Sequence, residues 1–181
     1  MIAFCVLLLN SSLSFAKIKN WAKVNPMIFR GGRPSEALDV KKLKAMGIQT
    51  IIDLENNAKV IEREGRFAKS LGMDFISVPM YWDQRPSDSD VNGLLSAMSQ
   101  VRRSGPIFIH CFHGRDRTGV IVALYRVFVE SWDAESAYRE MLKLGFNVKF
   151  KPLLDYFSDR TGYIPTLARG YRPYRRSQIR N

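Results

Sequence analysis

The sequence predicts a single α/β domain, for three reasons. The chain has 181 residues, which is near the usual size of one domain and long enough to bury a core. From Met27 onward, short apolar runs alternate with amphipathic stretches, as strands and helices do in an α/β domain. The sequence contains no internal repeat that would indicate another architecture. We therefore expect one domain at residues 17–160, between an apolar N-terminal segment and a basic C-terminal tail.

The first half of this domain is expected to hold three strands and two helices. Residues 27–30 are predicted as an edge strand before a GGRP turn. Residues 35–46 begin with a serine N-cap and stop at a glycine, which is typical of a helix. The run IQTIIDL, 48–54, is short and β-branched, which favours a strand. Residues 59–71 repeat the amphipathic pattern up to another glycine, and DFISVPM, 74–80, is the next predicted strand.

The second half begins with a loop, YWDQRPSDSD, at residues 81–90. Ser87 or Asp88 is expected to cap a helix that runs to residue 101. The apolar run PIFIHC, 106–111, predicts a buried strand, and residues 118–130 predict an apolar helix directly after it. Two amphipathic helices are expected to complete the domain, at 133–144 and 151–158.

The chain begins with features of an export signal. An apolar run is followed by polar residues and by Ser14-Phe15-Ala16, with small residues where a signal peptidase cleaves. We expect residues 1–16 to be removed and the protein to be periplasmic or secreted; an ordinary core segment is the alternative, since no Lys or Arg precedes the run. The run is too short to span a bilayer. Cleavage would remove Cys5 and leave Cys111 as the only thiol, which therefore needs a chemical explanation.

The charge is strongly positive, with 28 Lys and Arg residues against 17 Asp and Glu residues and a formal net charge of +11. Such an excess favours polyanionic partners, among them nucleic acids, anionic membranes and phosphorylated small molecules. Arginines gather among prolines and tyrosines in the C-terminal tail, residues 161–181. This tail is interpreted either as a solvated segment or as one that recruits an anion.

The stretch FIHCFHGRDRTG, 108–119, carries the clearest chemical signal. A strand, a glycine-containing loop and a helix direct the loop amides and the helix N-terminus at one point, which favours phosphate binding and the thiolate form of Cys111. Arg117 closes the loop, where a planar guanidinium can bind two phosphoryl oxygens. Gly114 and Gly119 allow the backbone to approach the anion closely. The Thr118 hydroxyl is placed to hydrogen-bond the departing sulfur.

This stretch resembles the H-C-x5-R-[ST]-G signature of the cysteine-dependent tyrosine and dual-specificity phosphatases, with His110 before Cys111 and Thr118-Gly119 after Arg117. The resemblance implies the fold of that superfamily, a twisted, mostly parallel sheet flanked by helices. It also implies that the cysteine attacks phosphorus and forms a phosphocysteine intermediate, with no metal and no other cofactor. His110 would then be a structural residue that helps to set the geometry and acidity of the cysteine.

The same superfamily protonates the leaving oxygen with an aspartate from a mobile loop upstream of the cysteine. Asp83 is our candidate, because it lies at the start of a proline-containing loop and resembles the aspartate of the phytase-like branch. It would act first as general acid and then as general base. Asp88 and Asp90 compete for this role, but each is better explained as a cap or a first-turn carboxylate of the next helix.

Four more residues of the loop are candidate substrate contacts. Phe112, His113 and Arg115 lie on its rim, where a role in substrate binding competes with that of ordinary exposed loop residues. The Asp116 carboxylate is expected to orient Arg117 or a nearby backbone group. An aspartate at this position recurs in similar enzymes that act on phosphoinositides and other non-protein phosphates.

Three basic residues outside the loop are also candidates. Arg30 and Arg33 belong to FRGGRPS, which is similar to a segment near the active site of small bacterial relatives. Lys59 follows a predicted strand at its carboxyl end, where ligands bind in open α/β sheets. We expect these residues to hold secondary phosphates, with a solvated turn and helix start as the alternative.

Other interpretations explain less of the pattern. A zinc site built from His110, Cys111 and His113 lacks the second spaced pair of ligands that structural zinc uses. A sulfurtransferase loop does not require Arg117, Thr118 and an upstream aspartate together. A phosphate-binding module without activity does not require the complete set of nucleophile, arginine and acid. A nucleic-acid-binding module would explain the charge but not the loop.

The expected substrate is an inositol polyphosphate. Export would separate the enzyme from most cytosolic phosphoproteins, and the net charge suits a ligand with many phosphates. Residues 27–158 are similar to a minimal tyrosine-phosphatase-like phytase, such as a small member from a predatory bacterium, without the extra barrel domain of the larger ones. We expect a monomer that binds a phosphorylated small molecule, does not bind nucleic acid and does not span a membrane; a secreted protein phosphatase is the alternative.

Overall fold

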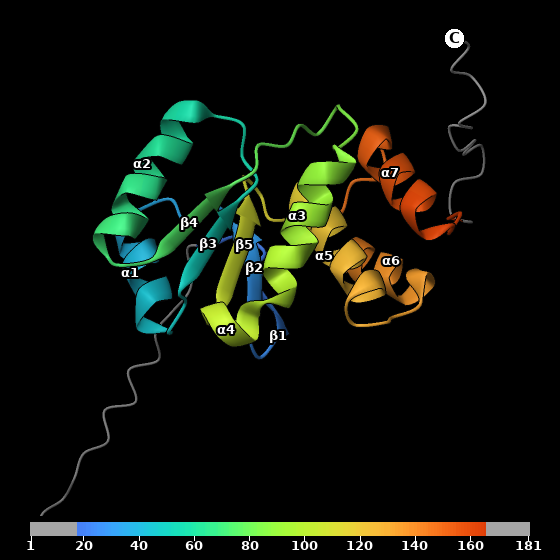
Figure 1. Ribbon diagram of the computed structural model, residues 1–181. Helices are drawn as coiled ribbons and strands as arrows, with labels where there is room; N and C mark the ends of the chain where they lie inside the picture. Colours follow the sequence, from blue (N-terminus) through green and yellow to red (C-terminus); the bar gives the residue numbers. More distant parts are fainter. Residues whose placement is uncertain (1–17, 166–181) are drawn as a thin grey trace, which may run out of the picture.

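The computed structural model describes residues 18–165, which form a five-stranded sheet with the strand order β1-β2-β5-β3-β4 (Figure 1). Strand β1 is antiparallel to β2, and the remaining neighbours are parallel. The predicted mostly parallel sheet is therefore confirmed. The strands are β1 (Ala22–Asn25), β2 (Ile28–Gly32), β3 (Thr50–Asp53), β4 (Asp74–Ser77) and β5 (Ile107–Cys111).

Helices cover both faces of the sheet (Figure 1). On one face, α1 and α2 pack on Ile51 and Phe108; on the other, α3 and α5 pack on Ile52, Ile107 and Ile109. Residues of β5 thus alternate between two apolar clusters, which explains why the whole strand is buried. The helices are α1 (Ala37–Ala45), α2 (Ala58–Ser70), α3 (Asp88–Ser99), α4 (Val101–Ser104), α5 (Asp116–Phe128), α6 (Ala134–Lys143) and α7 (Lys151–Thr161).

Several local predictions need correction. The strand at 27–30 is not an edge strand, because β1 pairs with it on one side and β5 on the other. Helix α1 is capped by Glu36 in a reciprocal capping box with Asp39, and Ser35 instead donates to the Asp39 carboxylate. Strand β4 ends at Ser77, although the backbone N–H groups of Val78 and Met80 still donate to carbonyls of the neighbouring segment.

Because β2, β3 and β5 are parallel, their carboxyl ends lie at the same edge of the sheet. The loop between β5 and α5 lies at this edge, and so does the segment that follows β4 (Figure 1). Helix α7 ends at Thr161, close to the predicted domain end at residue 160. The expected export signal, with Cys5, and most of the basic tail lie outside the described residues. Within residues 18–165, every helix is too short or too polar to cross a membrane.

Candidate active site

Cys111 ends the buried strand β5 and lies at a pocket of about 310 Å³. Its exposed fraction is only 2%. Helix α5 begins at Asp116, two residues earlier than predicted, so that Arg117 and Thr118 belong to its first turn. The pocket is lined by Trp82, Cys111, Phe112, His113, Arg115, Asp116, Arg117 and Phe150.

Two backbone carbonyls fix the guanidinium of Arg117. Its Nη1 donates to the carbonyl of Leu54 at 3.1 Å and to that of Met80 at 3.0 Å. These residues follow β3 and β4, so the sheet edge itself sets the direction of the side chain. Arg117 is buried and still borders the pocket beside Cys111. A fixed cation next to a thiol is an arrangement that binds a phosphoryl group attached to that sulfur.

The cysteine loop rests on the backbone of β2. Gly114 has a φ of +72°, and a Cβ at this position would lie 2.2 Å from the carbonyl carbon of Gly31. Arg30 Nη2 donates to the Gly114 carbonyl at 2.8 Å. Burial lowers the pKa of Arg30 to about 10, although the nearby Cys111 opposes this change. Arg30 is 1% exposed and does not line the pocket, so its observed contact is with the loop, and the expected contact with substrate stays a prediction.

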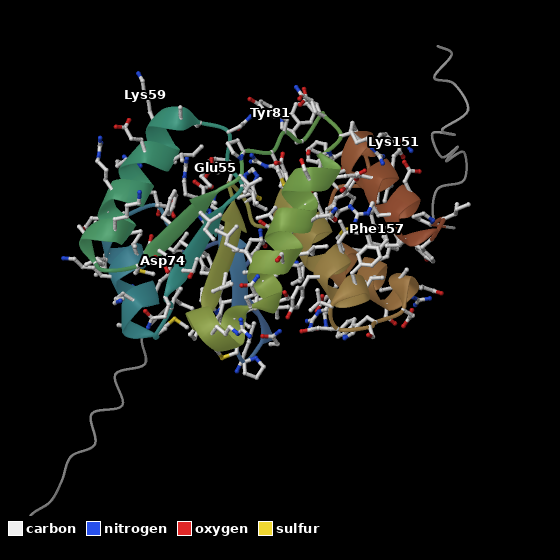
Figure 2. All side chains as sticks on the ribbon, in the orientation of Figure 1. Glu55, Lys59, Asp74, Tyr81, Lys151 and Phe157 are labelled. Atoms are coloured by element: carbon white, nitrogen blue, oxygen red, sulfur yellow. The ribbon has the colours of Figure 1, made fainter. Side chains whose placement is uncertain are left out.

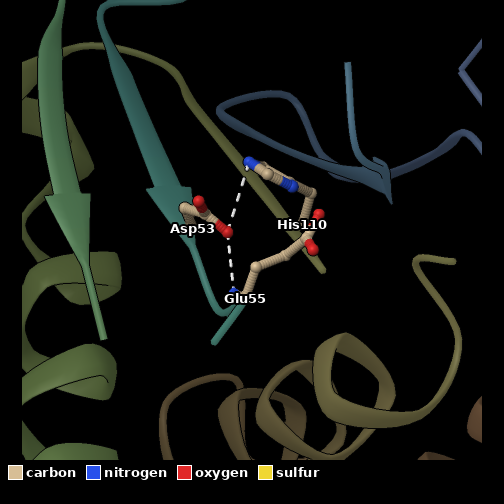
Figure 3. A group of neighbouring side chains, drawn as sticks. All are labelled: Asp53, Glu55 and His110. Atoms are coloured by element: carbon tan, nitrogen blue, oxygen red, sulfur yellow. Dashed lines mark hydrogen bonds and ion pairs between the residues drawn. The ribbon is translucent and has the colours of Figure 1, made fainter. Parts of the chain in front are cut away.

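A buried ionic network surrounds His110, the residue before Cys111, and Figure 3 shows His110 with Asp53 and Glu55. His110 Nε2 is 3.0 Å from Glu64 Oε1 and 3.9 Å from Asp53 Oδ1. Burial opposes the charged imidazole, but the carboxylates of Glu64 and Asp53 outweigh it and raise the pKa of His110 to about 9. Burial raises the pKa of Asp53 to about 6. His110 is thus a structural cation next to the nucleophile, in the place that the resemblance assigned to it.

Sequence reasoning missed Asp53, Glu55 and Glu64. Asp53 is the last residue of β3, and Glu55 follows two residues later at the sheet edge where ligands bind. This position in the sequence is the signal that could have identified them. Together with His110 they have donor atoms within 4.8 Å of one another, which suits a cation by donor type. Two of the donors already have charged partners, however, because Glu55 pairs with Arg33 and His110 pairs with Glu64. We therefore interpret the group as an ionic network.

The other basic candidates lie around the pocket in different ways. Arg33 Nε is 3.4 Å from Glu55 Oε1, and the Arg33 guanidinium lies 4.8 Å from the centroid of the Phe112 ring. The Arg33 guanidinium thus packs on the ring of Phe112, which lines the pocket. Lys59 is exposed in the first turn of α2, extends into solvent and does not line the pocket (Figure 2).

Of the other residues in the cysteine loop, Asp116 bonds to a backbone group, whereas His113 and Arg115 are candidates for contact with a ligand. Asp116 Oδ1 accepts the backbone N–H of Asn147 at 2.8 Å, so it orients a backbone group as expected. Burial, Arg115 and Lys19 lower the pKa of His113, which together with Arg115 borders the pocket.

The two residues after Arg117 lie inside the helix. Gly119 leaves room for Met141, which would be 3.2 Å from an added Cβ. The Thr118 hydroxyl is fully buried and has no hydrogen-bond partner among the described residues.

The aspartate candidates occupy distinct environments. Asp88 Oδ1 accepts from the Tyr156 hydroxyl at 2.9 Å and from Arg160 at 3.4 Å, and the bond from Tyr156 lowers the pKa of Asp88. Asp88 is therefore committed to packing α3 against α7. Asp83 is exposed and follows Trp82, which lines the pocket, but its own carboxylate does not line it.

Comparison with known proteins agrees with this geometry. A family model described as DSP-PTPase phosphatase fused to NAD+ kinase, abbreviated PTP-NADK, matches residues 14–150. The dual specificity protein phosphatase TpbA of Pseudomonas aeruginosa is 28% identical over 145 residues, which cover 80% of this chain and 61% of TpbA. The inositol diphosphatase DSP2 of Oryza sativa subsp. japonica is 27% identical over 132 residues, covering 67% of this chain and 59% of that protein. The chain thus spans about three fifths of the length of these curated relatives.

Solved structures show the same fold. The crystal structure of P. aeruginosa TpbA matches with a TM-score of 0.66 and 25% identity over 78% of this chain and 84% of that one. TpbA in complex with phosphotyrosine matches with a TM-score of 0.65 and 25% identity over 76% of this chain and 82% of that one. Because the family match spans most of the domain and all of the cysteine loop, the chain belongs to the PTP-NADK family of DSP-type PTPases.

Proposed function

We propose that this protein hydrolyses phosphate monoesters, without a metal, through a phosphocysteine intermediate. The observation that carries the proposal is the placement of Cys111 at a pocket beside Arg117, whose guanidinium is fixed by two backbone carbonyls. The start of α5 and the loop amides add positive potential where the phosphoryl oxygens would lie. This supplies the binding and electrostatic stabilisation on which phosphoryl transfer depends.

The proposed reaction has two steps. The Cys111 thiolate attacks phosphorus, so that an S–P bond forms, the bond to the leaving oxygen breaks, and Asp83 gives that oxygen its proton. Water then attacks phosphorus while Asp83 takes a proton from it, and the S–P bond breaks to release inorganic phosphate. The buried Thr118 hydroxyl is available to donate to the departing sulfur. This role of Asp83 requires its carboxylate, which follows the pocket-lining Trp82, to turn toward the pocket while the loop keeps its position.

We propose an inositol polyphosphate as the substrate of a phytase-like enzyme, acting after export to the periplasm or outside the cell. The net charge of +11 supports a highly anionic ligand. Arg115 and His113 border the pocket, and Lys59 lies in the first turn of α2, which follows β3 at the same edge of the sheet. A relative named as an inositol diphosphatase also supports this substrate class.

A second candidate is a phosphotyrosyl residue, favoured by one specific observation. Trp82, Phe112 and Phe150 line the pocket, and aromatic walls suit an aryl group better than a polyhydroxylated ring. A TpbA structure is described as a complex with phosphotyrosine.

Phosphate release decides between these functions. Residues 17–181 are incubated with a chelator and either inositol hexakisphosphate or a phosphotyrosyl peptide. Cys111→Ser should abolish release while ligand binding remains, and substantial residual activity would exclude the mechanism. Asp83→Asn should slow turnover by about 10²-fold or more. Preference for the peptide would replace the inositol substrate with the second candidate, whereas no release from either would reject the proposed function.

A further inference from the structure

Helix α7 and its N-cap residue contact the loop that carries Asp83, residues 78–87, which we call the acid loop. The loop runs along the top of the molecule in Figure 1 and reaches α7. The ring centroids of Trp82 and Phe150 are 5.1 Å apart, and Phe150 is the N-cap of α7. Trp82 is 52% exposed, and Phe150 is the ring against which it packs. The residue before Asp83 is therefore held by α7.

A second contact lies on the other side of Asp83. Arg85 Nη1 is 2.6 Å from Asp159 Oδ2, and the Arg85 guanidinium lies 4.7 Å from the centroid of the Tyr156 ring. Tyr156 is itself fixed, because its hydroxyl donates to Asp88 at the start of α3. A cation that both pairs with a carboxylate and covers an aromatic face has a narrower choice of positions than one with a single partner.

Asp83 lies between these two contacts and has no hydrogen bond or ion pair of its own among residues 18–165. The position of its carboxylate therefore depends on the flanking residues Trp82 and Arg85. General acid catalysis loses efficiency steeply when the acid is misplaced, since the proton must reach the leaving oxygen at hydrogen-bond distance. The partners of the acid loop on α7 should consequently affect proton transfer.

We propose that Phe150 and Asp159 are positioning residues that hold the acid loop so that Asp83 can protonate the leaving group. This inference rests on the proposed function. It assigns to the last helix of the domain a part in the reaction, although α7 contributes none of the reacting groups. Phe150 acts through Trp82 and also borders the pocket, whereas Asp159 acts only through Arg85.

The kinetic test compares Asp159→Asn with wild type on phenyl phosphate and on 4-nitrophenyl phosphate. The phenyl ester has the poorer leaving group and depends more on the acid, so its kcat should fall about two- to fivefold, the range expected for an exposed ion pair. The nitrophenyl ester should change by less than half as much, and KM should stay constant. Asp159→Glu, which keeps the charge, should restore the wild-type ratio. Equal losses on both esters would overturn a positioning role.

A control variant removes another surface ion pair, Glu135–Arg139, whose side chains are more exposed than those of Arg85 and Asp159. Glu135→Gln breaks the pair with Arg139 on α6, which does not contact the acid loop, and should leave both rates unchanged. If this control lowered the phenyl ester rate as much as Asp159→Asn does, the effect would be a general loss of charge or stability. Thermal unfolding of each variant shows whether it remains folded at the assay temperature.

A spectroscopic test separates this inference from the proposed function. The protein contains three tryptophans, and ¹⁹F NMR of 5-fluorotryptophan-labelled protein resolves Trp82 when its resonance is assigned with Trp82→Phe. Asp159→Asn and Phe150→Ala should each move the Trp82 resonance, while Glu135→Gln should not. If the Trp82 resonance does not move in either variant, Phe150 and Asp159 do not hold the acid loop, even if the enzyme is active. If the resonance moves in a protein without phosphatase activity, the two residues hold the acid loop but the proposed function is rejected.

Discussion

Replacing Glu64 by glutamine should abolish most of the pH dependence of stability between pH 6.5 and pH 9. Glu64 Oε1 lies 3.0 Å from His110 Nε2, and both side chains are buried. Burial alone would keep the imidazole neutral, so the rise of the pKa of His110 from 6.5 to about 9 depends on the neighbouring carboxylates, Glu64 first. This rise corresponds to about 3 kcal/mol of stabilisation in the protonated form.

The direction of the effect follows from linkage. The unfolded chain binds the His110 proton with the ordinary pKa of 6.5, and the folded chain binds it with a pKa of about 9. The stabilisation is therefore complete below pH 6.5 and is lost as the pH rises through 9. Burial raises the pKa of Asp53 from 3.8 to about 6. Asp53 therefore lowers the stability of the folded state as the pH rises from 3.8 to about 6. Its contribution is nearly constant above pH 6.5.

Urea unfolding of wild type and Glu64→Gln at pH 6.5, 7.5 and 9 measures the effect. The variant should lose about 3 kcal/mol at pH 6.5 and about 1 kcal/mol or less at pH 9. Glu62→Gln is the matched control, because it breaks an exposed pair with Arg66 on the same helix and should cost less than about 0.5 kcal/mol at every pH. If Glu64→Gln and wild type lose stability in parallel from pH 6.5 to 9, Glu64 does not hold the His110 proton.

Three further substitutions test the loop. Gly114→Ala should lower the free energy of unfolding by about 3 kcal/mol or prevent folding, because the added Cβ would meet the backbone of β2. Gly47 has a similar φ but lies in open space, so Gly47→Ala should cost only about 1 kcal/mol. Thermal unfolding compares the two variants. Thr118→Val should leave stability unchanged and, in rapid-quench experiments, accumulate phosphoenzyme as turnover falls about tenfold. Arg30→Lys should lower the free energy of unfolding by about 1–3 kcal/mol with little change in KM. If KM rises while stability is unchanged, Arg30 contacts the substrate.

The central unit of the site could be predicted from sequence because its residues are neighbours in the chain. The strand, the loop and the helix around Cys111 are continuous, and hydrophobic periodicity locates each of them. The ionic partner of His110 could not be found in this way, since Glu64 reaches it from the middle of an amphipathic helix. A glutamate in such a helix normally faces solvent, and only the packing of α2 on the sheet brings this one inside.

The position of Arg30 shows a related limit. An arginine near a glycine-rich turn suggested an anion contact, but residues alternate along a strand and the parallel pairing of β2 with β5 directs this one beneath the loop. The contacts of the acid loop with α7 were also beyond sequence reasoning, because Arg85 and Asp159 are 74 residues apart and neither belongs to a motif. Pairings of this kind depend on how a loop packs against a helix that is distant in the sequence.

The placement of the positive charge leads to a last prediction, on the substrate. Among the described arginines near Cys111, Arg117 and Arg30 donate to backbone carbonyls and Arg33 pairs with Glu55. Arg115 lines the pocket, and its Nε lies 3.9 Å from Asp116 Oδ2. A second phosphate would thus meet few uncommitted cations at the pocket. Residues 166–181 contain five arginines and no acidic residue, so they are a further source of positive charge for a polyphosphate.

Deletion of residues 166–181 should therefore lower kcat/KM for inositol hexakisphosphate about tenfold or more and leave 4-nitrophenyl phosphate within twofold, because only the first substrate carries phosphates beyond the reacting one. The loss should shrink as salt rises from 50 to about 200 mM. The control replaces the five arginines by glutamine at constant length and should reproduce the deletion. If both substrates lose activity equally, the tail acts on folding, and the aromatic walls of the pocket make an aryl phosphate the better assignment.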